Sequence, residues 1–232
     1  MNLTRIVNKL YFQPRRRELD RHFYEAEKLQ NEAMKYLLEK AKYTEYGRKH
    51  LFSTIRKYDD FVQNIPVNTY EELKADIERM RHGERNVLWP GQTKWYAKSS
   101  GTTNDKSKFI PITSEGLHGL HYQGGKDVVA FYLSNHPESR LLDGKSLILG
   151  GSHSPNYNLS NALVGDLSAI LIENINPLVN ISRVPSKEVA LLSDFEIKRE
   201  RIAHETINKN VTNISGVPSW MLSVLVYVIE LS

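Results

Sequence analysis

The chain has 232 residues, with 31 lysines and arginines against 27 aspartates and glutamates, and a formal net charge of +4 at pH 7. This length allows one large domain or two small ones. Hydrophobic residues make up 40% and charged residues 25% of the chain, which excludes a largely disordered chain or a fibrous repeat. The absence of cysteine excludes disulfides, thiolate metal sites and a cysteine nucleophile.

The positive charge is concentrated at the N-terminal end, where residues 1–57 hold 14 basic and 7 acidic side chains. The run Arg15–Arg17, with neighbouring tyrosines, could form a surface for nucleic acid or an anionic membrane. Acidic residues interleaved from Glu18 to Glu39 favour a solvated amphipathic helix instead. No apolar run is long enough to span a membrane, and no signal peptide pattern is present. We therefore expect a cytoplasmic protein that binds neither nucleic acid nor membrane.

The first third of the chain has helical periodicity. Apolar residues recur at helical spacing over residues 3–11 until Pro14 interrupts them, which predicts a short amphipathic helix. The pattern resumes over residues 15–43 and predicts one long helix. We expect residues 1–82 to form a helical N-terminal segment.

Thr69 and Glu72 have the spacing of a capping box, which predicts a helix that ends near residue 80. After residue 83, runs typical of strands alternate with helical stretches, which favours an α/β fold. The strands are expected at residues 93–98, 107–112, 146–149 and 211–215. The helices are expected at residues 114–134, 167–174 and 187–209.

The loop between the first two predicted strands carries the clearest chemical signal. Its residues are Ser99, Ser100, Gly101, Thr102 and Thr103, followed by Lys106 and Lys108. The glycine permits close backbone approach, and the backbone N–H groups and hydroxyls can hold phosphate oxygens, with the lysines offsetting their charge. The loop does not have the Walker P-loop pattern. On composition alone, a polar hairpin turn is an equally good interpretation.

The order of residues in this loop resembles the phosphate-binding loop of the adenylate-forming superfamily. Lys108 comes five residues after Thr103 and is followed by Phe109-Ile110-Pro111, which is similar to the branch of auxin-responsive Gretchen Hagen-type acyl acid-amido synthetases. Ile65-Pro66-Val67 upstream and Gly216-Val217-Pro218-Ser219-Trp220 downstream also resemble that branch. The resemblance therefore extends over most of the chain.

This resemblance implies an α/β fold that is a partial N-terminal domain of the adenylate-forming type, with residues 83–232 as the adenylation part and the phosphate-binding loop at 99–108. The implied reaction uses ATP and Mg²⁺ to activate a carboxylic acid as an acyl-adenylate. The acyl group then passes to an amine, for which an amino acid is expected. The loop residues up to Thr103, with Lys106, would bind ATP, and Lys108 would be catalytic. Because later family motifs are absent, we expect the chain alone to be inactive.

A second group of candidates lies beyond the loop. Gly150-Gly151-Ser152-His153 follows a predicted strand, where α/β proteins bind ligands, although a plain turn is an equal alternative. In the family that the loop resembles, the helix after it lines the acid pocket. Here residues 113–136 contain no arginine, and Lys126 is the one lysine. The predicted contacts to the acid substrate are His121, Lys126, Gly151, His153 and Gly216.

Other function classes remain open at this point. An acyl-CoA synthetase would share the loop but would form a thioester. A non-enzymatic helical binding module would use the basic N-terminal end. His118 and His121 could share a helix face as metal ligands, but the sequence places no third ligand near them, so no metal site is predicted.

Overall fold

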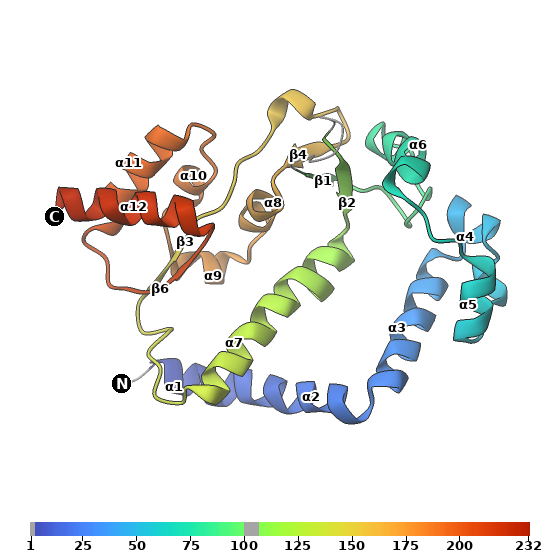
Figure 1. The fold of residues 1–232 in the computed structure, drawn as a ribbon, viewed down its shortest axis with the longest axis horizontal. Coiled ribbons are helices and arrows are strands. Elements are labelled where there is room, and N and C mark those ends of the chain that lie inside the picture. The colour runs from blue at the N-terminus through green and yellow to red at the C-terminus, as the bar shows by residue number, and fades with distance from the viewer. Residues whose placement is uncertain (1–2, 100–106) are drawn as a thin grey trace. The chain divides into compact units, whose positions relative to one another are not determined.

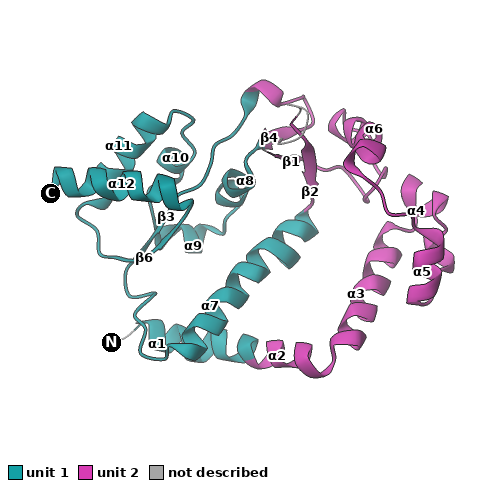
Figure 2. Ribbon diagram, viewed as in Figure 1, with its two compact units in different colours: residues 1–16, 114–155, 165–232 teal, residues 17–113, 156–164 magenta. Residues whose placement is uncertain are grey.

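The computed structural model describes residues 3–99 and 107–232, and the chain divides into two compact units (Figures 1 and 2). Unit 1 comprises residues 1–16, 114–155 and 165–232, and unit 2 comprises residues 17–113 and 156–164. Each unit is thus assembled from segments that are distant in the chain. The boundary expected at residue 82 lies inside unit 2.

The N-terminal segment is helical, as expected. It contains α1 (Leu3–Val7), the π-helical η1 (Asn8–Phe12), α2 (Gln13–Tyr24) and α3 (Ala26–Ala41). Contrary to the prediction, Pro14 does not interrupt the helix. The N–H of Gln13 donates to the oxygen of Asn8, five residues back, so Pro14 falls in the first turn of α2. A proline is tolerated there because its missing N–H costs no bond within the helix.

The long helix predicted over residues 15–43 is divided at Glu25. This residue has φ −125° and ψ 23°, outside the helical region. Its carboxylate accepts hydrogen bonds from Arg21 and Lys28, one on each side of the bend. The apolar period therefore identified the helical content of this region but not the break within it.

Unit 2 adds short helices and a three-stranded sheet to this segment. Its further elements are α4 (Glu45–Lys49), η2 (Phe52–Thr54), α5 (Tyr58–Asn64), α6 (Tyr70–Arg81), β1 (Trp95–Lys98) and β2 (Phe109–Ile112). β1 lies between β2, with which it pairs in antiparallel fashion, and β4 (Leu163–Gly165). The capping prediction for α6 is confirmed, since the Glu72 carboxylate accepts from the N–H and the hydroxyl of Thr69, at 2.6 and 2.8 Å.

Unit 1 holds the parallel sheet that the α/β prediction required. Its order is β5-β3-β6, and Figure 1 shows β3 and β6 side by side. The elements of this part are η3 (Gly116–Tyr122), α7 (Gln123–Asn135), β3 (Lys145–Ile148), α8 (Leu167–Glu173), α9 (Pro177–Ile181), β5 (Arg183–Val184), α10 (Lys187–Ala190), α11 (Phe195–Thr206), β6 (Val211–Ser215) and α12 (Pro218–Leu231). The short η4 (Pro155–Tyr157) begins in unit 1 and ends in unit 2. The helix predicted over 187–209 is divided into α10 and α11.

The first helices of the chain are anchored to α7 within unit 1. The Arg15 guanidinium donates to both carboxylate oxygens of Asp127, at 2.7 and 2.9 Å. The Arg16 guanidinium lies 4.4 Å from the ring centroid of Phe131. Two of the three consecutive arginines thus make contacts inside the unit, which weakens the case for a basic binding surface. None of the helices in residues 3–99 and 107–232 combines the length and apolar character of a transmembrane span.

The sheet of unit 1 contributes to an apolar core. Its buried members are Leu147, Leu149, Val184, Val189, Ile202, Met221 and Val224. Leu147 on β3 is 1% exposed, whereas Ile214, its register partner on β6, is 53% exposed. These two residues allow a matched test of the core.

We expect Leu147→Ala to lower the free energy of unfolding by about 2–5 kcal/mol, because it removes buried methyl groups and leaves a cavity. Urea denaturation followed by circular dichroism measures this change. Ile214→Ala is the control and should cost less than about 1 kcal/mol, because its side chain is largely solvated. Equal losses for the two variants would mean that β3 does not occupy the core of the unit.

Candidate functional site: a cavity at the sheet edge and a phosphate hairpin

A cavity of about 740 Å³ lies in unit 1 where β3 and β6 end. Because the two strands are parallel, the turns after them meet at one edge of the sheet, the position where α/β proteins bind ligands. The lining residues are His121, Tyr122, Gly125, Ile148, Leu149, Gly150, Gly151, Asp166, Ser168, Leu171, Ile172, Ile175, Ser215, Gly216, Val217 and Trp220. The volume suits a ligand of drug size.

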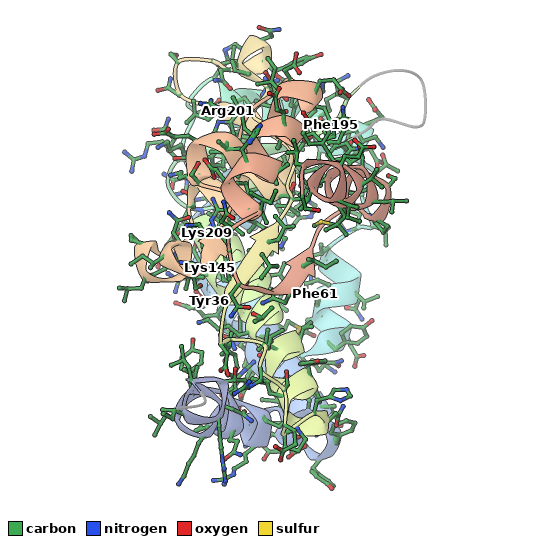
Figure 3. The ribbon with its side chains drawn as sticks, turned by 90° about the vertical axis from the view of Figure 1, so that its left-hand side faces the viewer. Tyr36, Phe61, Lys145, Phe195, Arg201 and Lys209 are labelled. Atoms are coloured by element: carbon green, nitrogen blue, oxygen red, sulfur yellow. The ribbon has the colours of Figure 1, made fainter. Side chains whose placement is uncertain are left out.

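Most of the cavity surface is aliphatic or aromatic. Tyr122 comes from the π-helical η3, and its hydroxyl donates to the Leu171 oxygen at 2.8 Å. Burial raises the pKa of Tyr122, so its hydroxyl stays protonated. Trp220 lies in the first turn of α12, and its ring centroid is 5.6 Å from that of Phe195, which Figure 3 labels. Two helices thus supply aromatic side chains to one apolar cavity.

The turn after β3 forms the polar wall of the cavity. Both of its glycines are packed against α8. A Cβ on Gly150 would lie 2.6 Å from Cδ1 of Ile172, and a Cβ on Gly151 would lie 2.0 Å from Oδ2 of Asp166. Real Cβ atoms do not approach that closely, so a side chain at Gly150 would displace the end of the Ile172 side chain, and one at Gly151 would collide with Asp166, whose Cβ would lie 2.6 Å away. The turn is thus closely packed against the side chains of Asp166 and α8.

Side chains from two helices bind the backbone of this turn. Gly151 N–H donates to Oγ of Ser168 at 2.8 Å, and Ser152 N–H donates to Oδ2 of Asp166 at 3.0 Å. From α11, Lys198 Nζ donates to the carbonyl oxygens of Gly150 and Gly151, at 2.7 and 2.9 Å. Lys198 is only 3% exposed. Burial lowers the pKa of this lysine to about 8, partly offset by the Asp166 carboxylate.

The cavity includes three of the five residues predicted to contact the acid, namely His121, Gly151 and Gly216. Lys126 is not among its lining residues, and its Nζ lies 5.7 Å from the ring centroid of Tyr11. His153 also lies outside the lining. It forms an isolated bridge with Gly165, and its Nε2 is 3.9 Å from Oε2 of Glu173.

The predicted phosphate loop joins β1 and β2 in unit 2. Ser100, Gly101, Thr102, Thr103 and Lys106 lie outside the described residues. At its base, Ser99 N–H donates to the Lys108 oxygen at 2.9 Å, and Lys108 N–H donates to Oγ of Ser99 at 3.3 Å. The segment is thus a hairpin connection, and this base is compatible with either a phosphate loop or a simple turn.

Cations gather at the base of this hairpin. Lys108 Nζ lies 5.4 Å from the ring centroid of Tyr70, and Lys98 Nζ lies 4.1 Å from that of Tyr157. The Arg81 guanidinium lies 3.8 Å from the ring centroid of Phe109. The ammonium groups of Lys98 and Lys108 and the Ser99 hydroxyl thus belong to the residues that flank the predicted phosphate loop. In the described part of the chain, no group of three or more His, Asp or Glu side chains gathers to hold a metal ion, and we assign no magnesium ligands.

Several residues of these sites were not identified from the sequence. Lys98 was not predicted as a site residue because it precedes the loop motif. Asp166 and Ser168 lie at the start of α8, where Asp and Ser usually signal only a helix cap. Trp220 and Tyr122 have the helical spacing of ordinary core residues. The fold of unit 1 brings Tyr122, Asp166, Ser168 and Trp220 to one cavity although they are distant in the sequence.

Comparison with solved structures defines the class of fold. The structure of the GH3.15 acyl acid amido synthetase superposes with a TM-score of 0.71 at 21% identity, over 88% of this chain and 36% of that chain. Its complex with 2,4-DB gives the same TM-score over 89% of this chain. The chain thus has the α/β fold of the N-terminal region of such synthetases, and the predicted fold class is confirmed.

The sequence comparisons then identify the family. The GH3 family N-terminal domain matches residues 15–229. The chain is 31% identical over 121 residues to indole-3-acetic acid-amido synthetase GH3.15 of Arabidopsis thaliana, which is 52% of this chain and 20% of that protein. It is 30% identical over 92 residues to jasmonoyl-L-amino acid synthetase JAR6 of Nicotiana attenuata, which is 39% of this chain and 16% of that protein. The chain belongs to the GH3 family, as its loop predicted, and the named relatives are ligases.

The lowered pKa of Lys198 predicts how the free energy of unfolding depends on pH. Between about pH 8 and 10.5, the unfolded lysine is protonated while the folded one is losing its proton. The unfolded state then binds more protons, so this group makes the free energy of unfolding rise with pH in that window, by at most about 1.4 kcal/mol per pH unit. Lys198→Met should remove this contribution. Urea unfolding of both proteins from pH 7 to 10.5 measures it, and identical pH slopes would show that Lys198 titrates normally.

Proposed function

We propose that this chain is the acid-activating part of an acyl acid amido synthetase that uses ATP. The carboxylate oxygen of the acid attacks the α-phosphorus of ATP, pyrophosphate leaves, and an amine, with an amino acid as the expected acceptor, then displaces AMP from the acyl carbon. The observation that carries the proposal is the apolar cavity at the carboxyl edge of a parallel sheet in a chain of the GH3 family.

The cavity in unit 1 would hold the apolar body of the acid. Ile148, Leu171 and Ile172 supply aliphatic surface, and Trp220 supplies an aromatic face. Burial of apolar ligand area against such a wall is worth about 25 cal/mol per Å² before the costs of binding. Polar groups at the Gly150–Gly151 turn would fix the orientation of the ligand. His121, Gly151 and Gly216 are the contacts we propose among the residues expected from the sequence.

The hairpin in unit 2 would hold the phosphates of ATP. Ser99, Lys98 and Lys108 are the described donors, and the hydroxyls of residues 100–103 with Lys106 complete the set proposed from the sequence. Mg²⁺ bound with the nucleotide would neutralise phosphate charge. The first step needs no general base, because a carboxylate is already ionised at neutral pH. Positioning and charge stabilisation would therefore be the main tasks of these residues.

Acid-dependent exchange of pyrophosphate into ATP tests this function. The assay uses the reading frame that contains this chain and a panel of acids: indole-3-acetate, jasmonate, benzoate and decanoate. Replacing Thr102 and Thr103 together with valine should lower exchange by about 100-fold, on the scale of losing preorganised donors to a transition state. If the folded double variant exchanges pyrophosphate at an unchanged rate, the loop does not bind the phosphates of ATP. Adding glycine or CoA after activation distinguishes amide from thioester formation.

Two glycines of α7 allow a test of the cavity that leaves the fold intact. A Cβ on Gly125 or on Gly124 would meet no atom within 4 Å, but only Gly125 lines the cavity. Gly125→Leu should weaken binding of an acid from the panel at least about tenfold, because the new side chain occupies the space of the ligand. Isothermal titration calorimetry measures the affinity.

Gly124→Leu is the matched control and should leave the affinity unchanged. Both substitutions remove a helix-interior glycine, so neither should destabilise α7. If Gly125→Leu binds the acid as tightly as the unaltered chain, the ligand does not occupy this cavity.

A further inference from the structure

Two consecutive peptide groups in the turn after β3 are bound at both ends. The Gly150–Gly151 peptide accepts from Lys198 Nζ through its C=O and donates to Ser168 Oγ through its N–H. The Gly151–Ser152 peptide accepts from the same Nζ and donates to Oδ2 of Asp166. One ammonium group and two acceptors therefore determine the orientation of both peptide planes.

The charges in this arrangement match the peptide dipoles. In a trans peptide the C=O and N–H point in opposite directions, so the cation on α11 and the acceptors on α8 lie on opposite sides of the turn. The ammonium attracts the negative ends of both dipoles, and the Asp166 carboxylate attracts one positive end. Charge-assisted hydrogen bonds are stronger than neutral ones, and bonds linked through a peptide group polarise one another.

Stability alone does not account for a lysine at this position. Removing an ammonium from water is costly, and an apolar side chain of similar volume would avoid that cost. The buried Lys198 instead fixes the orientation of the backbone at Gly150 and Gly151, which line the cavity. A turn of two glycines would sample many conformations if these hydrogen bonds did not hold it.

We propose that Lys198 is a positioning residue of the cavity, which holds the Gly150–Gly151 and Gly151–Ser152 peptides in the orientation that the ligand meets. The role of the turn in ligand binding rests on the proposed function. The hydrogen bonds by which Lys198 holds the turn do not depend on that function. The two parts are therefore tested separately.

Amide hydrogen exchange of the ligand-free chain tests the first part. Lys198→Met removes both hydrogen bonds from Nζ to the turn, so the N–H groups of Gly151 and Ser152 should exchange at least about tenfold faster. Leu149 N–H, which donates to the Ser215 oxygen at 2.8 Å, reports on the sheet and should change less than about twofold. Acceleration of all three amides by one factor, or of none, would overturn the proposal.

A matched control and a second variant accompany this measurement. Lys145 also donates its Nζ to a backbone carbonyl, that of Ile181 at 2.6 Å, but it lies at the other end of β3 and is partly solvated. Lys145→Met should leave the turn unchanged. If Lys198→Met does not fold, Ser168→Ala releases the turn from the α8 side at an exposed position. It should accelerate Gly151 but not Leu149, and failure to do so contradicts the proposal.

Calorimetric affinity for a panel acid that the unaltered chain binds tests the second part. Lys198→Met should raise the dissociation constant at least about tenfold, and Lys145→Met should not change it. Selective acceleration at the turn with an unchanged dissociation constant would overturn the role of Lys198 in ligand binding. If the unaltered chain binds no panel acid while the turn is selectively accelerated, the proposed function fails and the holding role of Lys198 stands.

Discussion

The hydrogen bonds from Lys198 Nζ to the carbonyl oxygens of Gly150 and Gly151 link the main features of unit 1. They connect α11 to the end of β3, while Ser168 and Asp166 connect the same turn to α8. The position of the lysine in turn depends on the apolar core, in which Ile202 of α11 packs with residues of the sheet. Core packing, a buried cation and a cavity wall are thus parts of one arrangement.

The topology explains why the cavity lies where it does. β3 is the central strand, and both of its neighbours, β5 and β6, run parallel to it. The chain therefore leaves the sheet after β3 and after β6 at the same edge, and Gly150 and Gly216 mark these exits. Gly216 is packed too closely for a side chain, since a Cβ there would lie 2.8 Å from Cβ of Leu149. The hairpin of unit 2 carries a different chemistry, in which cations stack on aromatic rings beside a hydroxyl-rich connection.

Local signals were sufficient for much of this description. The capping box of α6, the strands around the loop and the turn after β3 all depend on neighbouring residues, and the structure agrees with the sequence there. The prediction that Pro14 interrupts the helix was wrong because the effect of this proline depends on the π-helical turn before it, which the residue pattern does not indicate. Lys198 lies 47 and 48 positions from the carbonyls it binds and follows Phe195-Glu196-Ile197, so by sequence it belongs to an ordinary exposed helix. Only the packing of α11 against the sheet distinguishes this lysine from its solvated neighbours.

The location of the bound acid is the central claim, and a heteronuclear NMR titration of the labelled chain with indole-3-acetate, jasmonate, benzoate and decanoate tests it most directly. We expect at least one acid to shift the backbone signals of Gly125, Gly151 and Gly216 together with the indole N–H of Trp220, with one common dissociation constant. These four groups come from separate segments of unit 1 and meet only at the cavity. Saturable shifts confined to other residues, or none with any of these acids, would contradict the account.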